Sequence, residues 1–412
     1  YALFSILWHY FIYDQQWRKT RSAFHQCMNL AAIPRFRPVQ ELETKKYLLK
    51  LLRDPSGFAE HGRHLIGAII MRVAYGIDVE EEGNHKYVKI AEDAMDVFNV
   101  VFQPGRYLVQ TIPSLRHIPS WFPGVKFKRD FARWIPVVEE LRDAPWEATT
   151  NIERGGHAHE SIASILLDRV EDKNKDEMDT AKRAAAAACI AGADTTLSTL
   201  STFLAAMASH PEAQKCAQKE LSRVIGSDRL PTLADKEDLP YVMAIVKECM
   251  RWRSVVPLAV PHFSIEEDVY MGYRIPKGSI VLSNIWSYSR DERYYPDPEA
   301  FRPERFLTEE RKLDSTVLNP SHCLRIWTED LPWTTLRRGV SFHDPLVCSS
   351  CVQHPSPFGQ RKKTITVGGE DDERRSIHYP GEAHRMLRAS ALIVTTKQRV
   401  VALSQYLQVR TV

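Results

Sequence analysis

One long apolar helix constrains the fold of this chain more than any other feature of its sequence. The pattern predicts that the helix opens at Asp179, continues through five consecutive alanines at 184–188 and ends near Ser209. Pro211 then suits the first turn of a following helix, where its missing N–H costs nothing. Such a helix needs a sizeable interior, and 412 residues can bury a large core as one big domain or two smaller ones.

The chain up to about residue 255 is expected to be mostly helical. Helical periodicity is clear at 41–52, 62–75 and 91–98, Gly76 is a stop signal for the second of these, and 127–154 resumes the pattern. Pro113, Pro119 and Pro123 predict a loop between helices. From 255 to 290, apolar and turn residues alternate, which predicts a few short strands containing Val255, Val256, Val260, Ile280, Val281 and Leu282.

Charge and cysteine usage exclude some classes of protein. A net charge of +3 and a pI near 8.4 argue against a dedicated nucleic-acid binder. Seven cysteines without a disulfide framework favour a reducing compartment. The apolar stretch at 2–13 is far shorter than the roughly 20 residues that span a bilayer, and it lacks signal-peptide flanks. We therefore expect the natural N-terminus, and any membrane anchor with it, to be absent.

A six-residue motif, Ala-Gly-Ala-Asp-Thr-Thr at 191–196, lies in the middle of the long helix. Glycine, aspartate and threonine are poor choices for the centre of a buried helix. One interpretation is a kinked core helix whose threonines bond back to the preceding turn. The other is a local widening that admits a small ligand, with the Asp194 carboxylate beside the Thr195 hydroxyl to pass protons.

Two further motifs follow in order. Glu248 and Arg251 are spaced to share a helix face, but alone they would indicate only a surface ion pair worth about 0–1 kcal/mol. About fifty residues later the chain reads Phe-Arg-Pro-Glu-Arg-Phe at 301–306, preceded by Tyr-Pro-Asp-Pro at 295–298. A carboxylate between two guanidiniums can accept bidentate bonds, so a cluster of Glu248, Arg251 and Arg305 is expected.

These motifs, in this order and near this spacing, resemble those of the cytochrome P-450 family of haem–thiolate monooxygenases, in the style of its fungal microsomal members. Trp17-Arg18-Lys19-Thr20-Arg21 resembles the family's W-x-x-x-R helix, and Pro261-His262 resembles the segment after its E-x-x-R helix. The resemblance covers residues 1–320, from the W-x-x-x-R helix to the meander that holds 295–306. It implies a mainly α fold, the cytochrome P-450 fold with a small β portion, expected here to be incomplete at both ends.

The resemblance also implies a reaction and its parts. One oxygen atom from O2 would enter an apolar organic substrate, with haem b as cofactor and electrons from NADPH through a partner reductase. Asp194 and Thr195 would deliver protons. The cofactor-binding residues would be Trp17, Arg21, Ala191, Gly192 and His262, and the structural cluster would be Glu248, Arg251 and Arg305. Association with the cytosolic face of the endoplasmic reticulum membrane is implied as well, and no nucleic-acid partner is expected.

One segment of the family pattern is missing. The family needs F-G-x-G-x-R-x-C-x-G soon after the meander, because its cysteine thiolate is the axial ligand of the haem iron. Cys323 lacks the glycines that let the backbone turn tightly under a porphyrin. Cys348 and Cys351 form a lone C-x-x-C, which is more often incidental than metal-binding. We therefore assign no metal ligand in this sequence.

Reading the codons one nucleotide later explains the loss. Trp has one codon and every Thr codon begins with A, so in the shifted frame Trp327-Thr328 and Trp333-Thr334 must each yield glycine. These two glycines have the spacing of the second and last glycines of the haem loop. The remaining codons permit the whole loop. We therefore expect a reading-frame slip between Asn319 and Cys323, which would make 321–412 an out-of-frame, poorly ordered tail without selected packing.

Two alternatives come from other classes of protein. Without the axial cysteine, this chain would be a catalytically inactive remnant or a mistranslated product that does not bind haem. We favour that interpretation for this particular sequence and the monooxygenase for its lineage. A helical scaffold with accidental motifs is discounted by the ordered set of motifs.

Overall fold

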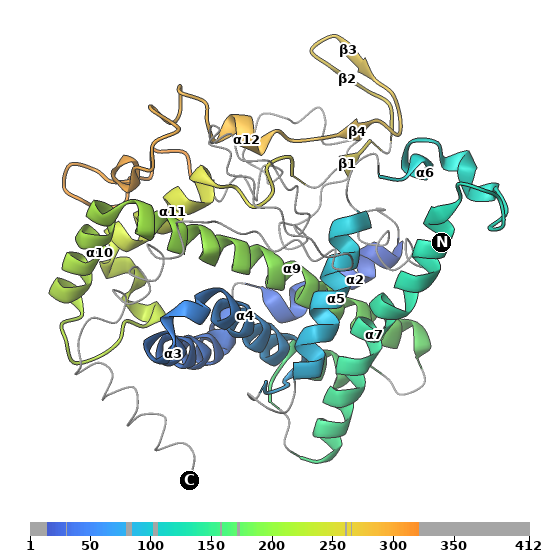
Figure 1. Cartoon of the computed structure of the whole chain (residues 1–412), viewed down its shortest axis with the longest axis horizontal. Helices are drawn as coiled ribbons and strands as arrows, with labels where there is room; N and C mark the ends of the chain where they lie inside the picture. Colours follow the sequence, from blue (N-terminus) through green and yellow to red (C-terminus); the bar gives the residue numbers. More distant parts are fainter. Residues whose placement is uncertain are drawn as a thin grey trace, which may run out of the picture.

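The computed structural model describes residues 15–29, 31–79, 85–101, 106–156, 159–170, 174–259, 262–264 and 266–320. These residues form a mainly α structure with two small sheets (Figure 1). The α-helices are α2 (Gln15–Met28), α3 (Arg37–Arg53), α4 (Phe58–Tyr75), α5 (His85–Val101), α6 (Leu108–Thr111), α7 (Lys126–Arg154), α8 (Ile162–Leu167), α9 (Lys175–Ser209), α10 (Pro211–Val224), α11 (Pro240–Trp252) and α12 (Ile285–Tyr288). Short 3-10 helices are η1 (Ile33–Phe36), η2 (Pro55–Gly57), η3 (Pro113–His117), η4 (Leu233–Asp238) and η5 (Pro303–Phe306).

The long apolar helix is α9, which crosses the middle of the molecule (Figure 1). It begins at Lys175 rather than Asp179, because the Asn174 side chain accepts a hydrogen bond from the Glu177 backbone N–H at 3.2 Å and caps an extra turn. Its end at Ser209 and the start of α10 at Pro211 agree with the sequence prediction.

Helix α4 packs along α9 in the antiparallel direction, and a glycine from each helix allows the close approach. A Cβ on Gly192 of α9 would lie 2.3 Å from Ile70 Cδ1, and one on Gly62 of α4 would lie 3.3 Å from Leu200 Cδ2. The end of α4 is confirmed at Gly76, which adopts a left-handed conformation (φ 70°) and donates to the Arg72 carbonyl.

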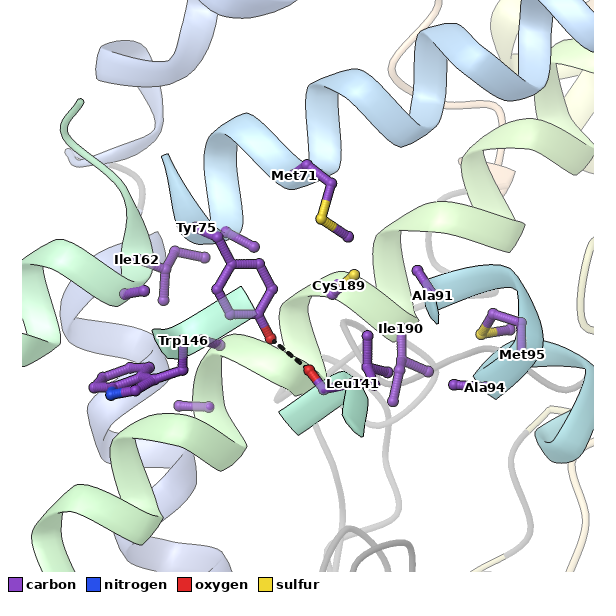
Figure 2. Packing of buried hydrophobic residues seen from close by; sticks show 14 of the residues in the cluster. Met71, Tyr75, Ala91, Ala94, Met95, Leu141, Trp146, Ile162, Cys189 and Ile190 are labelled. Atoms are coloured by element: carbon purple, nitrogen blue, oxygen red, sulfur yellow. Dashed lines mark hydrogen bonds between the residues drawn. The ribbon is translucent and has the colours of Figure 1, made fainter. Parts of the chain in front are cut away.

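The largest hydrophobic cluster lies where α4, α5, α7, α8 and α9 meet (Figure 2). Pro145 lies inside α7 and has no N–H to donate to the carbonyl of Leu141, one turn earlier. The buried Tyr75 hydroxyl donates to that carbonyl at 3.3 Å, which Figure 2 shows as a dashed line. Thr149, one turn after Pro145, donates in return to the Tyr75 carbonyl at 2.6 Å. Helices α4 and α7 are thereby joined at the carbonyl that the proline left without a helical partner.

The described residues between 262 and 281 form short strands, in the region where the sequence predicts a few of them. β1 (His262–Phe263) pairs antiparallel with β4 (Ile280–Val281), and β2 (Asp268–Tyr270) pairs with β3 (Tyr273–Ile275). The prediction was wrong for Val255 and Val256, which lie in bends after α11, where the Ala259 N–H donates to the Val256 carbonyl at 3.1 Å and closes a turn. It was also wrong for Leu282, which follows the end of β4. The region also holds helix α12, and the Pro-rich loop before α7 contains the 3-10 turn η3.

Within the described ranges, the helices are either too short or too polar to cross a membrane. The apolar stretch at 2–13, Val260 and the predicted tail at 321–412 lie outside the described residues.

Candidate functional site

The motif at 191–196 occupies the part of α9 where burial decreases. Cys189 and Leu204 on either side are buried, whereas Asp194 and Thr195 are half-buried and Thr196 is exposed. The helix remains α-helical through the motif, without the wider turn that one interpretation allowed. The Thr195 hydroxyl donates to the Ala191 carbonyl at 2.7 Å, as the other interpretation expected.

Gly192 also has a packing role that the sequence did not reveal. The 2.3 Å separation between its notional Cβ and Ile70 Cδ1 means that any larger residue would force the α4 side chain to move. Glycine at this position of α9 therefore leaves room for the terminal methyl of Ile70 on α4.

The predicted W-x-x-x-R helix is α2. Trp17 is buried and the Arg21 guanidinium lies 5.2 Å from the centre of its ring. Gln16 of the same helix donates to the Thr180 hydroxyl at 2.9 Å, which fixes α2 against the first half of α9. Among the predicted cofactor-binding residues, His262 lies in β1, and its side chain is outside what the structure describes.

The structure brings Glu248, Arg251 and Arg305 together. Both Glu248 and Arg251 lie on α11 with fully buried side chains, and the Arg251 Nε and Nη2 atoms donate to the two carboxylate oxygens at 2.7 and 2.8 Å. The Arg302 backbone N–H donates to Glu248 Oε1 at 2.8 Å, and Arg305 Nε does so at 3.3 Å. The carboxylate thus receives four donors, about as many as its lone pairs accept.

The two arginines also bind the backbone of the meander. Arg251 donates to the carbonyls of Ser289 and Ala300 at 2.9 and 3.2 Å. Arg305 donates to the carbonyls of Pro296, Asp297 and Ala300 at 2.7, 3.0 and 3.1 Å. Burial lowers the pKa of Arg305, and the adjacent Glu248 carboxylate opposes that shift. The cluster therefore fixes the path of residues 289–305 against α11.

Tyr295 extends this cluster, although no sequence motif marks it as a member. Its ring is fully buried and lies 5.4 Å from the Arg251 guanidinium carbon, and its hydroxyl donates to the Leu318 carbonyl at 2.9 Å. Leu318 is thereby connected to the cluster at the end of the described chain. In the sequence, Tyr295 stands out only as an aromatic residue directly before the Pro-Asp-Pro turn. That position alone does not indicate a hydrogen bond to a residue 23 positions later.

The donor set of the described residues does not fit a thiolate-ligated haem. Cys27, Cys189 and Cys249 are buried, and burial raises the pKa of Cys189 and of Cys249 to about 12, so both thiols are protonated. Cys216 lies half-buried on α10. No group of three or more His, Cys, Asp or Glu side chains that could hold a metal occurs in the described part. Cys323, Cys348 and Cys351 lie outside the described residues.

Comparison with known proteins decides the family. The model of the cytochrome P450 family matches residues 10–320. The chain belongs to the cytochrome P450 family. The mainly α P450 fold with few strands, which the sequence predicted, is thereby confirmed.

Fungal P450 monooxygenases are among the similar proteins. Cytochrome P450 monooxygenase COX1 of Coprinopsis cinerea is 40% identical over 314 residues, which is 75% of this P450 chain and 60% of the relative. Cytochrome P450 monooxygenase COX2 of the same fungus is 40% identical over 312 residues, 75% and 58% of the two chains. Cytochrome P450 monooxygenase 208 of Postia placenta is 40% identical over 296 residues, 72% and 57%. The chain therefore spans less than two thirds of these relatives.

Proposed function

We propose that this P450 descends from a monooxygenase that inserts one oxygen atom from O2 into an apolar organic substrate, with haem b as cofactor and electrons from NADPH through a partner reductase. Membership of the family and the names of its fungal relatives support a P450 monooxygenase in general. We further propose the cytosolic face of the endoplasmic reticulum membrane as its location, as the resemblance implies.

The chain's own residues support a division of roles. The Thr195 hydroxyl donates its hydrogen to the Ala191 carbonyl, so its oxygen still has lone pairs that can accept a hydrogen bond. Together with the Asp194 carboxylate, it would hold and pass protons in the half-buried middle of α9. Trp17, Arg21 and His262 would hold the propionates, and the Glu248 cluster would hold the meander.

A second candidate function concerns this sequence in particular, and one observation favours it. The sequence contains no F-G-x-G-x-R-x-C-x-G loop after Phe306, and the family match ends at residue 320. We propose that residues 321–412 are an out-of-frame tail, that 1–320 carries the P450 core, and that this chain is an inactive product of a monooxygenase gene. Sequencing the transcript across codons 315–330 tests the frame directly.

The proposed activity is tested in a full-length protein with the frame restored before Cys323. With its reductase and NADPH, this protein should place isotope from labelled O2 in the product. Thr195→Ala should leave the haem spectrum unchanged but uncouple NADPH use from product formation. Thr199→Ala is a matched control, because its half-buried hydroxyl makes the same back-bond, to the Thr195 carbonyl at 2.9 Å, one turn later. Equal uncoupling in both variants would remove the role given to Thr195.

A further inference from the structure

Helices α4 and α9 approach each other at two glycines that flank the motif at 191–196. Gly192 of α9 leaves room for Ile70, whose Cδ1 would lie 2.3 Å from a Cβ at that position. Gly62 of α4 leaves room for Leu200, whose Cδ2 would lie 3.3 Å from its Cβ. The contact residues are eight positions apart in both helices, 62 to 70 and 192 to 200, so the antiparallel pair keeps one register. We call these the two glycine contacts.

Between the two glycine contacts, α9 is packed lightly. Cys189 and Leu204 lie beyond the two contacts and are 0% and 3% exposed, so both halves of the helix are fixed in the core. Residues 193–199 are half-buried except for Thr196, which is exposed. Burial alone therefore does little to keep this stretch of α9 straight, and its contacts with α4 become important.

Two hydroxyl groups act against a straight helix in the same stretch. Thr195 donates to the Ala191 carbonyl at 2.7 Å, and Thr199 donates to the Thr195 carbonyl at 2.9 Å. Each of these carbonyls is also the acceptor for a helical N–H, and a second donor weakens that bond and favours a bend. The helix nevertheless remains α-helical along its whole length. Some contact must oppose the bend.

We propose that Ile70 is a positioning residue, whose δ-methyl group fills the space beside Gly192, holds α9 straight and so sets where Asp194 and Thr195 lie. Without that methyl group, the helix is free to bend at the Ala191 carbonyl, where the hydroxyl bond already favours bending. The consequence for proton transfer rests on the proposed function, which gives Asp194 and Thr195 their roles. The contact itself does not, because it involves only described residues of α4 and α9.

Hydrogen exchange of this chain, read by mass spectrometry of its peptides, tests the contact without haem. Ile70→Val removes the δ-methyl group, and the amides of 193–199 should exchange about two- to tenfold faster, as the loss of one packed methyl group predicts. Ile69→Val is the matched control, because Ile69 is equally half-buried but has no atom within 4 Å of the Cβ position of Gly192. It should leave exchange at 193–199 within about twofold of the parent chain.

A rescue experiment separates positioning from general loosening. In Ile70→Val/Gly192→Ala the new Cβ fills the space that the δ-methyl group left, so exchange at 193–199 should return to within about twofold of the parent. Gly192→Ala alone should not slow exchange, which excludes a simple effect of alanine's helix propensity. Equal acceleration in Ile70→Val and Ile69→Val would overturn the proposal. So would acceleration spread evenly over the other helices.

The full-length protein with the frame restored tests the link to proton transfer. There Ile70→Val should uncouple NADPH use from product formation and leave the haem spectrum unchanged, whereas Ile69→Val should do neither. Faster exchange at 193–199 with unchanged coupling would overturn the positioning role. A frame-restored parent that forms no oxygenated product would instead contradict the proposed function, and the exchange result would still decide whether Ile70 holds α9 straight.

Discussion

Arg251 donates two parallel hydrogen bonds to Glu248 within one turn of α11, and both side chains are completely buried. The pair is stable there because the remaining donors and acceptors also have partners, on Arg302, Arg305, Ser289 and Ala300. A surface ion pair would contribute little. The buried Glu248–Arg251 pair connects α11 to the meander, which follows about fifty residues later.

The first prediction concerns a variant that lacks this connection. Arg251→Ala leaves the Glu248 carboxylate buried with only part of its partners, and the free energy of unfolding should fall by about 3–5 kcal/mol. Urea unfolding followed by circular dichroism measures the loss. Arg274→Ala is the control, because Arg274 pairs with Glu267 at 2.6 Å while 71% of its side chain is exposed, and it should leave the unfolding curve in place. Similar curves for both variants would contradict a structural role for the cluster.

A second prediction concerns the carbonyl of Leu141. Tyr75→Phe removes its donor and should cost about 1–3 kcal/mol, as expected for a buried acceptor left unpaired. In a Pro145→Ala background the alanine at this position has a backbone N–H that can donate to the same carbonyl, so the cost of Tyr75→Phe should be smaller. A double-mutant cycle by chemical unfolding measures the coupling energy between the two substitutions, and a coupling above about 0.5 kcal/mol is resolvable. Strict additivity would mean that Pro145 and Tyr75 are unrelated.

The close approach at Gly192 supplies a third prediction. Gly192→Ala should destabilise the protein by about 0–2 kcal/mol, because the overpacking of its Cβ against Ile70 Cδ1 is partly offset by the higher helix propensity of alanine. Ile70→Val removes that methyl group and should cost about 0.5–1.5 kcal/mol alone. The double variant should nevertheless be more stable than Gly192→Ala. A double variant less stable than either single one would show that α4 and α9 do not meet at these two residues.

The fourth prediction follows from the buried thiols. The pKa of Cys189 rises from 9.0 to about 12 in the folded chain because burial disfavours the thiolate. Above pH 9 the Cys189 thiol loses its proton in the unfolded chain but keeps it in the folded chain. Its contribution to the free energy of unfolding is therefore complete below pH 9 and is lost as the pH rises towards 12. Cys189→Ala should therefore make the fall in unfolding free energy between these pH values shallower. An unchanged slope would show that the thiol is accessible.

The fold was largely predictable where local chemistry decides it. Gly76 ends α4 because the left-handed conformation suits glycine, and Pro211 starts α10 because the first turn needs no N–H there. The Asn174 cap was missed because the apolar pattern starts only at the following turn. Val255 and Val256 resemble strand residues, but the turn after α11 overrides their β propensity.

The cluster of Glu248, Arg251 and Arg305 was predictable as a set of residues and less so as a geometry. The spacing of Glu248 and Arg251 fixes their contact, because both lie on one helix. The hydrogen bond from Tyr295 to Leu318 depends on how the meander folds back, which no local pattern encodes. The role of Gly192 depends on Ile70 of another helix, and sequence spacing gives no information on that pairing.

The central claim is that this chain has the P450 core but cannot ligate haem through a thiolate. The most direct measurement is the absorption spectrum of the haem-reconstituted, reduced protein under CO, recorded beside the full-length frame-restored protein. The frame-restored protein should show the thiolate-type Soret band. This chain should show none, because its sequence lacks the haem loop and the thiols of Cys27, Cys189 and Cys249 are buried. A clear thiolate-type band from this chain would contradict the account.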